Sequence, residues 1–146
     1  MNVASRLLRR LVVAFSFVAI VTAASSVSGA GESLVTKSAR CRAMRAEAIA
    51  DVDRAKPELR NWKGPLHVLM SDVGDAIAAR RCRCSKVREL LGPPDEVVDG
   101  GGQHATVDVP RGETHWIYWW RGGHDYLYFV IRGGRVAEAR WWFAGE

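Results

Sequence analysis

The spacing of apolar residues changes once along this 146-residue chain, within residues 87–95. Before that segment apolar residues recur every three or four positions, as on one face of a helix. After it they alternate or form aromatic runs broken by paired glycines, as in strands. The helical part ends on three apolar residues, Val87, Leu90 and Leu91. Gly92 follows where a helix C-cap adopts positive φ, and Pro93 cannot continue a helix. The sequence therefore predicts an α+β fold, with helices first and strands after.

The first 30 residues have the three parts of a secretory signal peptide. They begin with three arginines, continue through the apolar run 11–24 and end in small residues before a cleavage site after Ala30. That apolar run is shorter than the roughly twenty residues that span a bilayer. We therefore expect a signal peptide at 1–30, an N-terminal helix and linker at 31–61, and an α+β domain at 62–146. Export to the periplasm or the exterior follows, and an uncleaved leader kept as a membrane anchor is the alternative.

The net charge of +5 comes largely from the leader. The leader holds three of the 21 basic residues and none of the 16 acidic ones, which leaves 18 against 16, or +2. Basic and acidic residues alternate along the rest of the chain, whereas a nucleic-acid-binding domain gathers its basic residues on one face. A nucleic-acid partner is therefore not expected.

Three cysteines would meet an oxidising compartment after export. Cys41 and Cys84 both lie on apolar helical stripes, and Cys82 is two residues off that stripe. We therefore expect a disulfide between Cys41 and Cys84, which would stabilise the fold by roughly 3–4 kcal/mol through closure of a loop of about forty residues. The Cys-x-Cys spacing is not the redox Cys-x-x-Cys motif and lacks a second pair for zinc, so no metal or cofactor is expected.

The helical part divides into three predicted segments. Residues 33–55 form an amphipathic helix, with one apolar stripe and a neighbouring Ile49; the stripe contains Cys41, Met44, Ala48, Val52 and Ala55. A loop follows, in which Trp62 is the one apolar anchor. The next stripe contains Leu66, Leu69, Met70, Val73 and Ile77. It changes phase at the arginines before Cys84, so two helices are favoured over one long helix.

The strand part is predicted to be an antiparallel meander of three main strands plus short edge strands, with the helices packed on one face. The main strands are 114–121, 124–132 and 135–143, separated by Gly122-Gly123 and Gly133-Gly134 as hairpin turns require. Short strands are expected at 97–98 and 105–109, with a flexible loop between them.

A two-residue turn at Gly122-Gly123 assigns the side chains of the first two main strands to faces. The helix-side set is Trp116, Tyr118, Leu127, Phe129 and Ile131, and the opposite set is Ile117, Trp119, Tyr126, Tyr128 and Val130. A two-residue turn at Gly133-Gly134 would place Val136 and Trp142 beside Phe129. A three-residue turn, which we favour, would instead place Ala137, Ala139 and Trp141 there, and leave Glu138 and Arg140 on the wetter side.

This order of helices, Leu-Leu-Gly-x-Pro-Asp segment and Trp-x-Tyr strand resembles the SmpA/OmlA (BamE-like) family, over roughly residues 62–143. The matching residues are Val87, Leu90, Leu91, Gly92, Pro94, Asp95, Trp116, Tyr118, Leu127, Phe129 and Val136. The resemblance implies the related β-lactamase-inhibitor-like fold and a role in binding rather than catalysis. The chain departs from the family at Arg81-Cys82-Arg83, before the second helix, and it has no lipidation cysteine after the leader.

Catalytic motifs are absent from the sequence, and the four histidines have no metal-ligand spacing. His115 and His124 flank the first hairpin, so we expect them near Asp125 as a surface pair. His67 and His104 are isolated in the sequence.

The aromatic excess of the strands exceeds the needs of one core, so an exposed aromatic face is expected. The predicted partner-binding residues are Trp119, Tyr126, Tyr128, Arg140 and Trp142. The alternative is that the N-terminal helix or a second copy of the chain, in a homodimer, covers that face. We therefore expect an exported, non-enzymatic domain that binds an envelope protein. The alternatives are a small envelope hydrolase or metal-binding protein, and an inhibitor of a secreted enzyme.

Overall fold

The computed structural model describes residues 31–50, 57–121 and 124–145, which belong to one compact unit that begins at Gly31. Its helical elements are α1 (Leu34–Ala50), the short 3-10 helix η1 (Pro57–Arg60), α2 (Pro65–Ala79) and α3 (Cys84–Leu91). The predicted leader, its cleavage site, Val52 and Ala55 lie outside the described residues. Within the described ranges, no helix is both long and apolar enough to cross a membrane.

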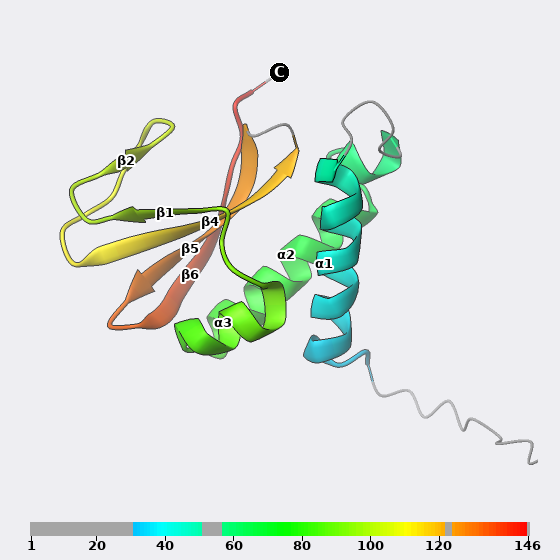
Figure 1. Ribbon diagram of the computed structural model, residues 1–146, viewed down its shortest axis with the longest axis horizontal. Coiled ribbons are helices and arrows are strands. Elements are labelled where there is room, and N and C mark those ends of the chain that lie inside the picture. The colour runs from blue at the N-terminus through cyan, green and yellow to red at the C-terminus, as the bar shows by residue number, and fades with distance from the viewer. Residues whose placement is uncertain (1–30, 51–56, 122–123, 146) are drawn as a thin grey trace, which may run out of the picture. The chain divides into compact units, whose positions relative to one another are not determined.

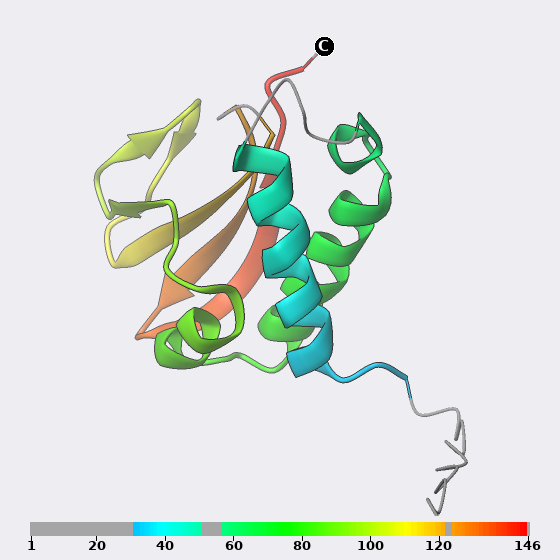
Figure 2. The same cartoon turned by 45° about the vertical axis from the view of Figure 1, so that its right-hand side comes forward.

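Six strands follow the helices, as the change of spacing predicts: β1 (Glu96–Asp99), β2 (Gln103–His104), β3 (Val107–Asp108), β4 (Glu113–Arg121), β5 (Asp125–Arg132) and β6 (Arg135–Trp142). Four of them form an antiparallel sheet in the order β1-β4-β5-β6. The helices cover one face of this sheet, and the hairpin β2–β3 lies on the opposite side (Figures 1 and 2). The predicted α+β class is therefore confirmed. We call the face away from the helices the second face.

Local sequence explains where the helices begin and end. Ser33 caps α1, since its Oγ accepts a hydrogen bond from Thr36 N–H at 3.2 Å. α2 begins at Pro65, whose missing N–H costs nothing in the first turn. Gly92 ends α3 with φ of 82°, as predicted, and its carbonyl accepts a 3.1 Å hydrogen bond from the Tyr118 hydroxyl. The predicted break between two helices is also confirmed.

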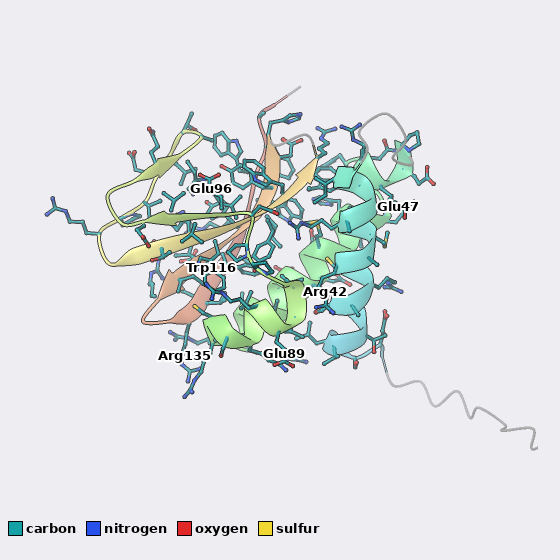
Figure 3. All side chains as sticks on the ribbon, viewed as in Figure 1. Arg42, Glu47, Glu89, Glu96, Trp116 and Arg135 are labelled. Carbon is teal, nitrogen blue, oxygen red and sulfur yellow. The ribbon has the colours of Figure 1, made fainter. Side chains whose placement is uncertain are left out.

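The helix-side core is the one that the pairing across Gly122-Gly123 predicts. Trp116 pairs with Phe129 and Tyr118 with Leu127, and all four are buried beneath the helices. We call the residues that match the SmpA/OmlA pattern the signature residues. Three of them, Val87, Leu90 and Leu91, are buried with this group. Arg88 of α3 lies over the Trp116 ring, 4.9 Å from its centroid, and Figure 3 shows Trp116 beside this helix.

The last strand corrects the predicted turn and the predicted position of Ala137, and it confirms the predicted face of Ala139 and Trp141. Arg132 pairs with Arg135, so Gly133-Gly134 is a two-residue turn and the favoured three-residue turn is wrong. A bulge at Ala137 then shifts the register, which places Ala139 opposite Phe129 and Trp141 opposite Leu127. Val136 is also buried on the helix side. Glu138 and Arg140 pair with Val130 and Tyr128 on the second face, as expected.

Two loop predictions need correction. Leu59 of η1 is the buried anchor before α2, and its carbonyl accepts a 2.9 Å hydrogen bond from Trp120 Nε1–H, while Trp62 is 49% exposed. The expected edge strand at 105–109 is only β3, and it pairs with β2 in a separate sheet. The chain turns first at Gly101, where φ is 91°, and again at Ala105, where φ is 50°, so a docked hairpin replaces the expected flexible loop.

The predicted disulfide between Cys41 and Cys84 is not formed, and all three cysteines are free thiols. Cys41 of α1 lies among core residues that include Leu91, the last residue of α3. Cys84 is the first residue of α3, at the opposite end of an eight-residue helix about 12 Å long. Shared apolar stripes therefore place both cysteines against one core, but at positions too far apart for a bridge.

Candidate functional site

Three aromatic side chains lie side by side near the ends of β4 and β6. Trp119 pairs with Tyr126 across β4 and β5, and Tyr126 pairs with Trp142 across β5 and β6. Residues paired in this way point to the same side of a sheet, so these three share the second face with Ile117, Tyr128 and Val130. The Trp119 and Tyr126 rings meet edge to face, with centroids 4.7 Å apart. We call Trp119, Tyr126 and Trp142 the aromatic row.

The predicted partner-binding residues differ in their exposure. Trp119 and Trp142 are half-buried and Arg140 is exposed, so these three reach the surface. Tyr126 and Tyr128 are only 2% and 4% exposed. The expectation that both tyrosines lie on an exposed aromatic face is therefore wrong, because another part of the chain covers them.

The hairpin β2–β3 supplies that cover. The His104 ring, 5% exposed, lies 4.9 Å from the Tyr128 ring and 5.5 Å from the Tyr126 ring, measured between centroids. It also lies 4.9 Å from the ring of His115 in β4. Part of the second face is thus covered by this hairpin. The two covers considered from the sequence, the N-terminal helix and a second copy of the chain, are not required there.

Polar atoms under the hairpin form a continuous row. The Tyr126 hydroxyl lies 2.7 Å from His104 Nδ1, and His104 Nε2 lies 2.6 Å from His115 Nδ1. His115 Nε2 points to Glu113, whose carboxylate is 3.5 Å away, too far for a good hydrogen bond but close enough for electrostatic attraction. Because the carboxylate only accepts, one arrangement satisfies the row: Tyr126 donates to His104, His104 donates to His115, and the remaining His115 N–H faces Glu113.

Burial sets the protonation of this row. Burial lowers the pKa of His104, and the neighbouring His115 lowers it further. Burial also lowers the pKa of His115, although Glu113 opposes the shift. For Tyr126, burial raises the pKa, with smaller contributions from Tyr128 and Glu96. The histidines are therefore neutral and the phenol protonated at neutral pH, which is what the hydrogen-bonded arrangement requires.

A pocket of about 470 Å³ opens beside the aromatic row, at the edge of the hairpin. Its walls include the three aromatic residues, with Glu96, Gln103 and His104. The volume lies within the range of roughly 300–1,000 Å³ usual for small-molecule sites. Glu96 stands on β1, the strand next to the hairpin (Figure 3).

The backbone of Trp119 is held from the helix side. Its N–H donates a 2.7 Å hydrogen bond to Asp95 Oδ2, and its carbonyl accepts one of 2.8 Å from Arg45 Nε of α1. Arg45 and Asp95 also form an ion pair. The signature residue Asp95 therefore fixes one end of the aromatic row and ties it to the N-terminal helix.

Charged residues continue along the second face beyond the tyrosines. Arg132 Nε lies 2.7 Å from Glu113, Arg132 Nη2 lies 3.1 Å from Glu138, and Arg140 Nε donates to Glu138 at 2.8 Å. Such exposed pairs contribute little to stability. They do neutralise Arg140, so this predicted binding residue already has an ionic partner.

The expectations for the two histidines beside the first hairpin have separate outcomes. His124 Nδ1 lies 3.4 Å from Asp125 Oδ1, as expected. His115 is 2% exposed and pairs with Val130 far from that turn, so the predicted surface pair is wrong for His115. Across residues 31–50, 57–121 and 124–145, no three His, Cys, Asp or Glu side chains are grouped as metal ligands.

Sequence reasoning missed the residues that come to the site from distant segments. Arg45 lies off the apolar stripe of the predicted N-terminal helix, and His104 falls in the predicted loop between the two short strands. One signal was available for His115, because strand alternation places it on the same face as Ile117 and Trp119. Nothing local indicated that Glu96 would border the aromatic row.

Comparison of the chain with protein-family models, with curated proteins and with solved structures finds no match. Membership of the SmpA/OmlA family therefore stays a prediction from the signature residues.

Proposed function

We propose that the chain is an exported, non-enzymatic interaction domain of the cell envelope that binds a protein partner at the aromatic row. The observation that carries the proposal is the setting of Trp119 and Trp142, half-exposed on either side of Tyr126 beside a pocket of about 470 Å³. Tryptophan and tyrosine are enriched among the residues that dominate binding energy at protein interfaces.

The rigidity of the row supports binding. Trp119 is held through its backbone by Asp95 and Arg45, and Tyr126 is held through its hydroxyl by His104. Side chains that are already ordered lose little conformational entropy when a partner docks, so more of the contact energy remains as affinity.

The polar row under the hairpin fits a structural role better than acid–base catalysis. Burial raises the pKa of Tyr126, so its phenolate is scarce at neutral pH. His104 and His115 are both buried; His104 uses its two ring nitrogens on Tyr126 and His115, and His115 uses Nδ1 on His104. These contacts hold the hairpin on the sheet and form one wall of the pocket.

The binding proposal is tested by retention experiments with residues 31–146 as immobilised bait. Wild type, a Trp119→Ala/Trp142→Ala double variant and Trp62→Ala are incubated with cell-envelope extract. Trp62 is the matched control, because it is an exposed tryptophan on the loop before α2. We expect the same specific proteins on wild type and Trp62→Ala, and their loss from the double variant. Equal retention by all three, with circular dichroism showing intact folds, contradicts the proposal.

Export is tested separately. Expression of the full chain should give a periplasmic or secreted product whose N-terminus, by mass spectrometry, lies within a few residues of Gly31. A full-length product in the membrane fraction contradicts this part of the proposal.

A further inference from the structure

The pocket beside the aromatic row has an unbalanced negative charge. Glu96 is exposed on β1 and lines the pocket, and within the described part of the chain it forms no ion pair. Its carboxylate is close enough to Tyr126 to raise the pKa of the phenol. His104, in the same wall, is neutral at pH 7 because burial lowers its pKa.

The basic residues around the row are already engaged, and His124, which also lines the pocket, lies 3.4 Å from Asp125 Oδ1. Arg45 pairs with Asp95, Arg121 with Asp125, and Arg140 with Glu138. Each of these carboxylates is therefore balanced by its own arginine, and none of the three arginines is left to compensate Glu96. A ligand that enters the pocket meets a single free carboxylate.

The aromatic walls add to this preference for positive charge. The faces of indole and phenol rings carry partial negative charge and attract cations, tryptophan most strongly. Trp119 and Trp142 lie on strands either side of β5, so their backbones are separated by two strand spacings, about 10 Å. Tyr126 stands between them and is buried, so a ligand in the pocket lies over the row, against the exposed parts of the two tryptophan rings.

Hydrogen bonding limits which cation fits. The Glu96 carboxylate only accepts hydrogen bonds. A ligand that satisfies it must supply N–H donors, which a quaternary ammonium lacks. A guanidinium supplies five donors on a plane that also stacks on aromatic faces.

We propose that the pocket beside the aromatic row binds an arginine side chain of the partner protein, through stacking on Trp119 and Trp142 and ionic hydrogen bonds to Glu96. The proposal rests on the proposed function and names the group that the site recognises.

The test uses three blocked tripeptides, Gly-Arg-Gly, Gly-Lys-Gly and Gly-Gln-Gly, and tetramethylammonium chloride. Each is titrated into residues 31–146 while the indole N–H signals of the tryptophans are followed by NMR. We expect saturable shifts of the Trp119 and Trp142 signals with the arginine peptide, weaker binding of the lysine peptide, and none with the glutamine peptide. Stronger binding of tetramethylammonium than of the arginine peptide overturns the proposal, as does equal binding of the three peptides.

Two variants and a control locate the site. Glu96→Gln and Trp142→Ala should each raise the Kd for the arginine peptide about fivefold to tenfold, as expected for loss of one ionic or cation–π contact. Asp75→Asn, which removes an exposed carboxylate from α2, should leave the Kd unchanged. An unchanged Kd for Glu96→Gln overturns the proposal.

The outcome is distinguishable from that of the retention experiment. If Glu96→Gln retains the envelope partner as well as wild type does, while the Trp119→Ala/Trp142→Ala variant loses it, the row is an interface but arginine is not its ligand. If the double variant also retains the partner, the proposed function itself fails.

Discussion

Neighbouring tryptophans in β4 show how strictly the alternation of a strand sorts identical side chains. Trp120 is completely buried on the helix side, where its indole N–H donates to the Leu59 carbonyl. Trp119, one residue earlier, is half-exposed on the second face and belongs to the pocket. The same side chain therefore stabilises the core at one position and is available for binding at the next.

This sorting predicts different stabilities for two aromatic-to-alanine variants. Phe129 is fully buried opposite Trp116 and Ala139, so Phe129→Ala should cost about 3–5 kcal/mol, enough to unfold a marginally stable domain. Trp119→Ala removes a half-buried ring and should cost about 1–2 kcal/mol. Thermal melts of both variants measure the contrast. Equal destabilisation would show that Trp119 is part of a closed core.

The three thiols should differ in reactivity. Cys41 is 2% exposed, and burial raises its pKa to about 11, so it carries almost no thiolate at neutral pH. Cys82 and Cys84 are half-buried near the surface. Mass spectrometry after brief treatment of the native reduced protein with iodoacetamide should find Cys41 unmodified, and all three cysteines modified in denaturant. Native labelling of Cys41 as fast as Cys82 would contradict the burial.

Among the elements, α2 packs closely on the sheet, and small residues at the contact allow it. A Cβ added at Gly74 would lie 3.1 Å from Leu127 Cδ2 and 3.5 Å from Ala139 Cβ. The bulge at Ala137 matters here, because it sets the register that places Ala139, rather than a larger side chain, beneath Gly74.

A larger residue at this crossing should separate the two layers. Gly74→Val should destabilise the fold by about 1–3 kcal/mol through overpacking, despite the better helix propensity of a residue with a Cβ. Ala79→Val, at the exposed end of the same helix, is the matched control and should change stability by no more than about 0.5 kcal/mol. Urea unfolding measures both, and a Gly74→Val variant as stable as the control would contradict the close packing.

The elements also show where the sequence was sufficient. The stripe of α2, the stop at Gly92 and the faces of β4 and β5 follow from short-range patterns, and each was predicted. The turn at Gly133-Gly134 was not, because a two-residue turn followed by a bulge gives later residues the same faces as a three-residue turn. His104 could not be placed, because its position depends on contacts with β4 and β5 rather than on its neighbours in the chain.

Across the whole molecule, buried histidines join layers that different segments supply. His104 and His115 connect the hairpin to the sheet, and His67 of α2 packs on Trp141 of β6, with ring centroids 4.6 Å apart. Burial lowers the pKa of all three. The folded protein therefore takes up protons on these rings at a lower pH than the unfolded chain does.

The fold should accordingly lose stability in mild acid. Stability from these histidines is fully present above their unfolded pKa of about 6.5 and falls as the pH drops towards their folded values, by at most about 1.4 kcal/mol per pH unit for each ring. Urea unfolding at pH 7.5, 6.5 and 5.5 should show this decrease, above the range in which Asp and Glu titrate. His104→Gln, which removes one of the three rings, should make this decrease smaller. A urea midpoint that stays the same from pH 7.5 to pH 5.5 would contradict the prediction.

The closed base of the hairpin has a consequence for how such a protein can change. Asp99 pairs with Thr114 where β1 and β4 meet, and Gly101 N–H donates to the Val109 carbonyl at 2.8 Å, so the segment 100–112 leaves the sheet and returns to it at neighbouring points. An insertion with this geometry is a cassette: its length and composition can be exchanged without disturbing the helix-side core, as happens with binding loops carried on a rigid scaffold. Replacing it would rebuild one wall of the pocket, so new ligand preferences could arise in a single step from an unchanged framework.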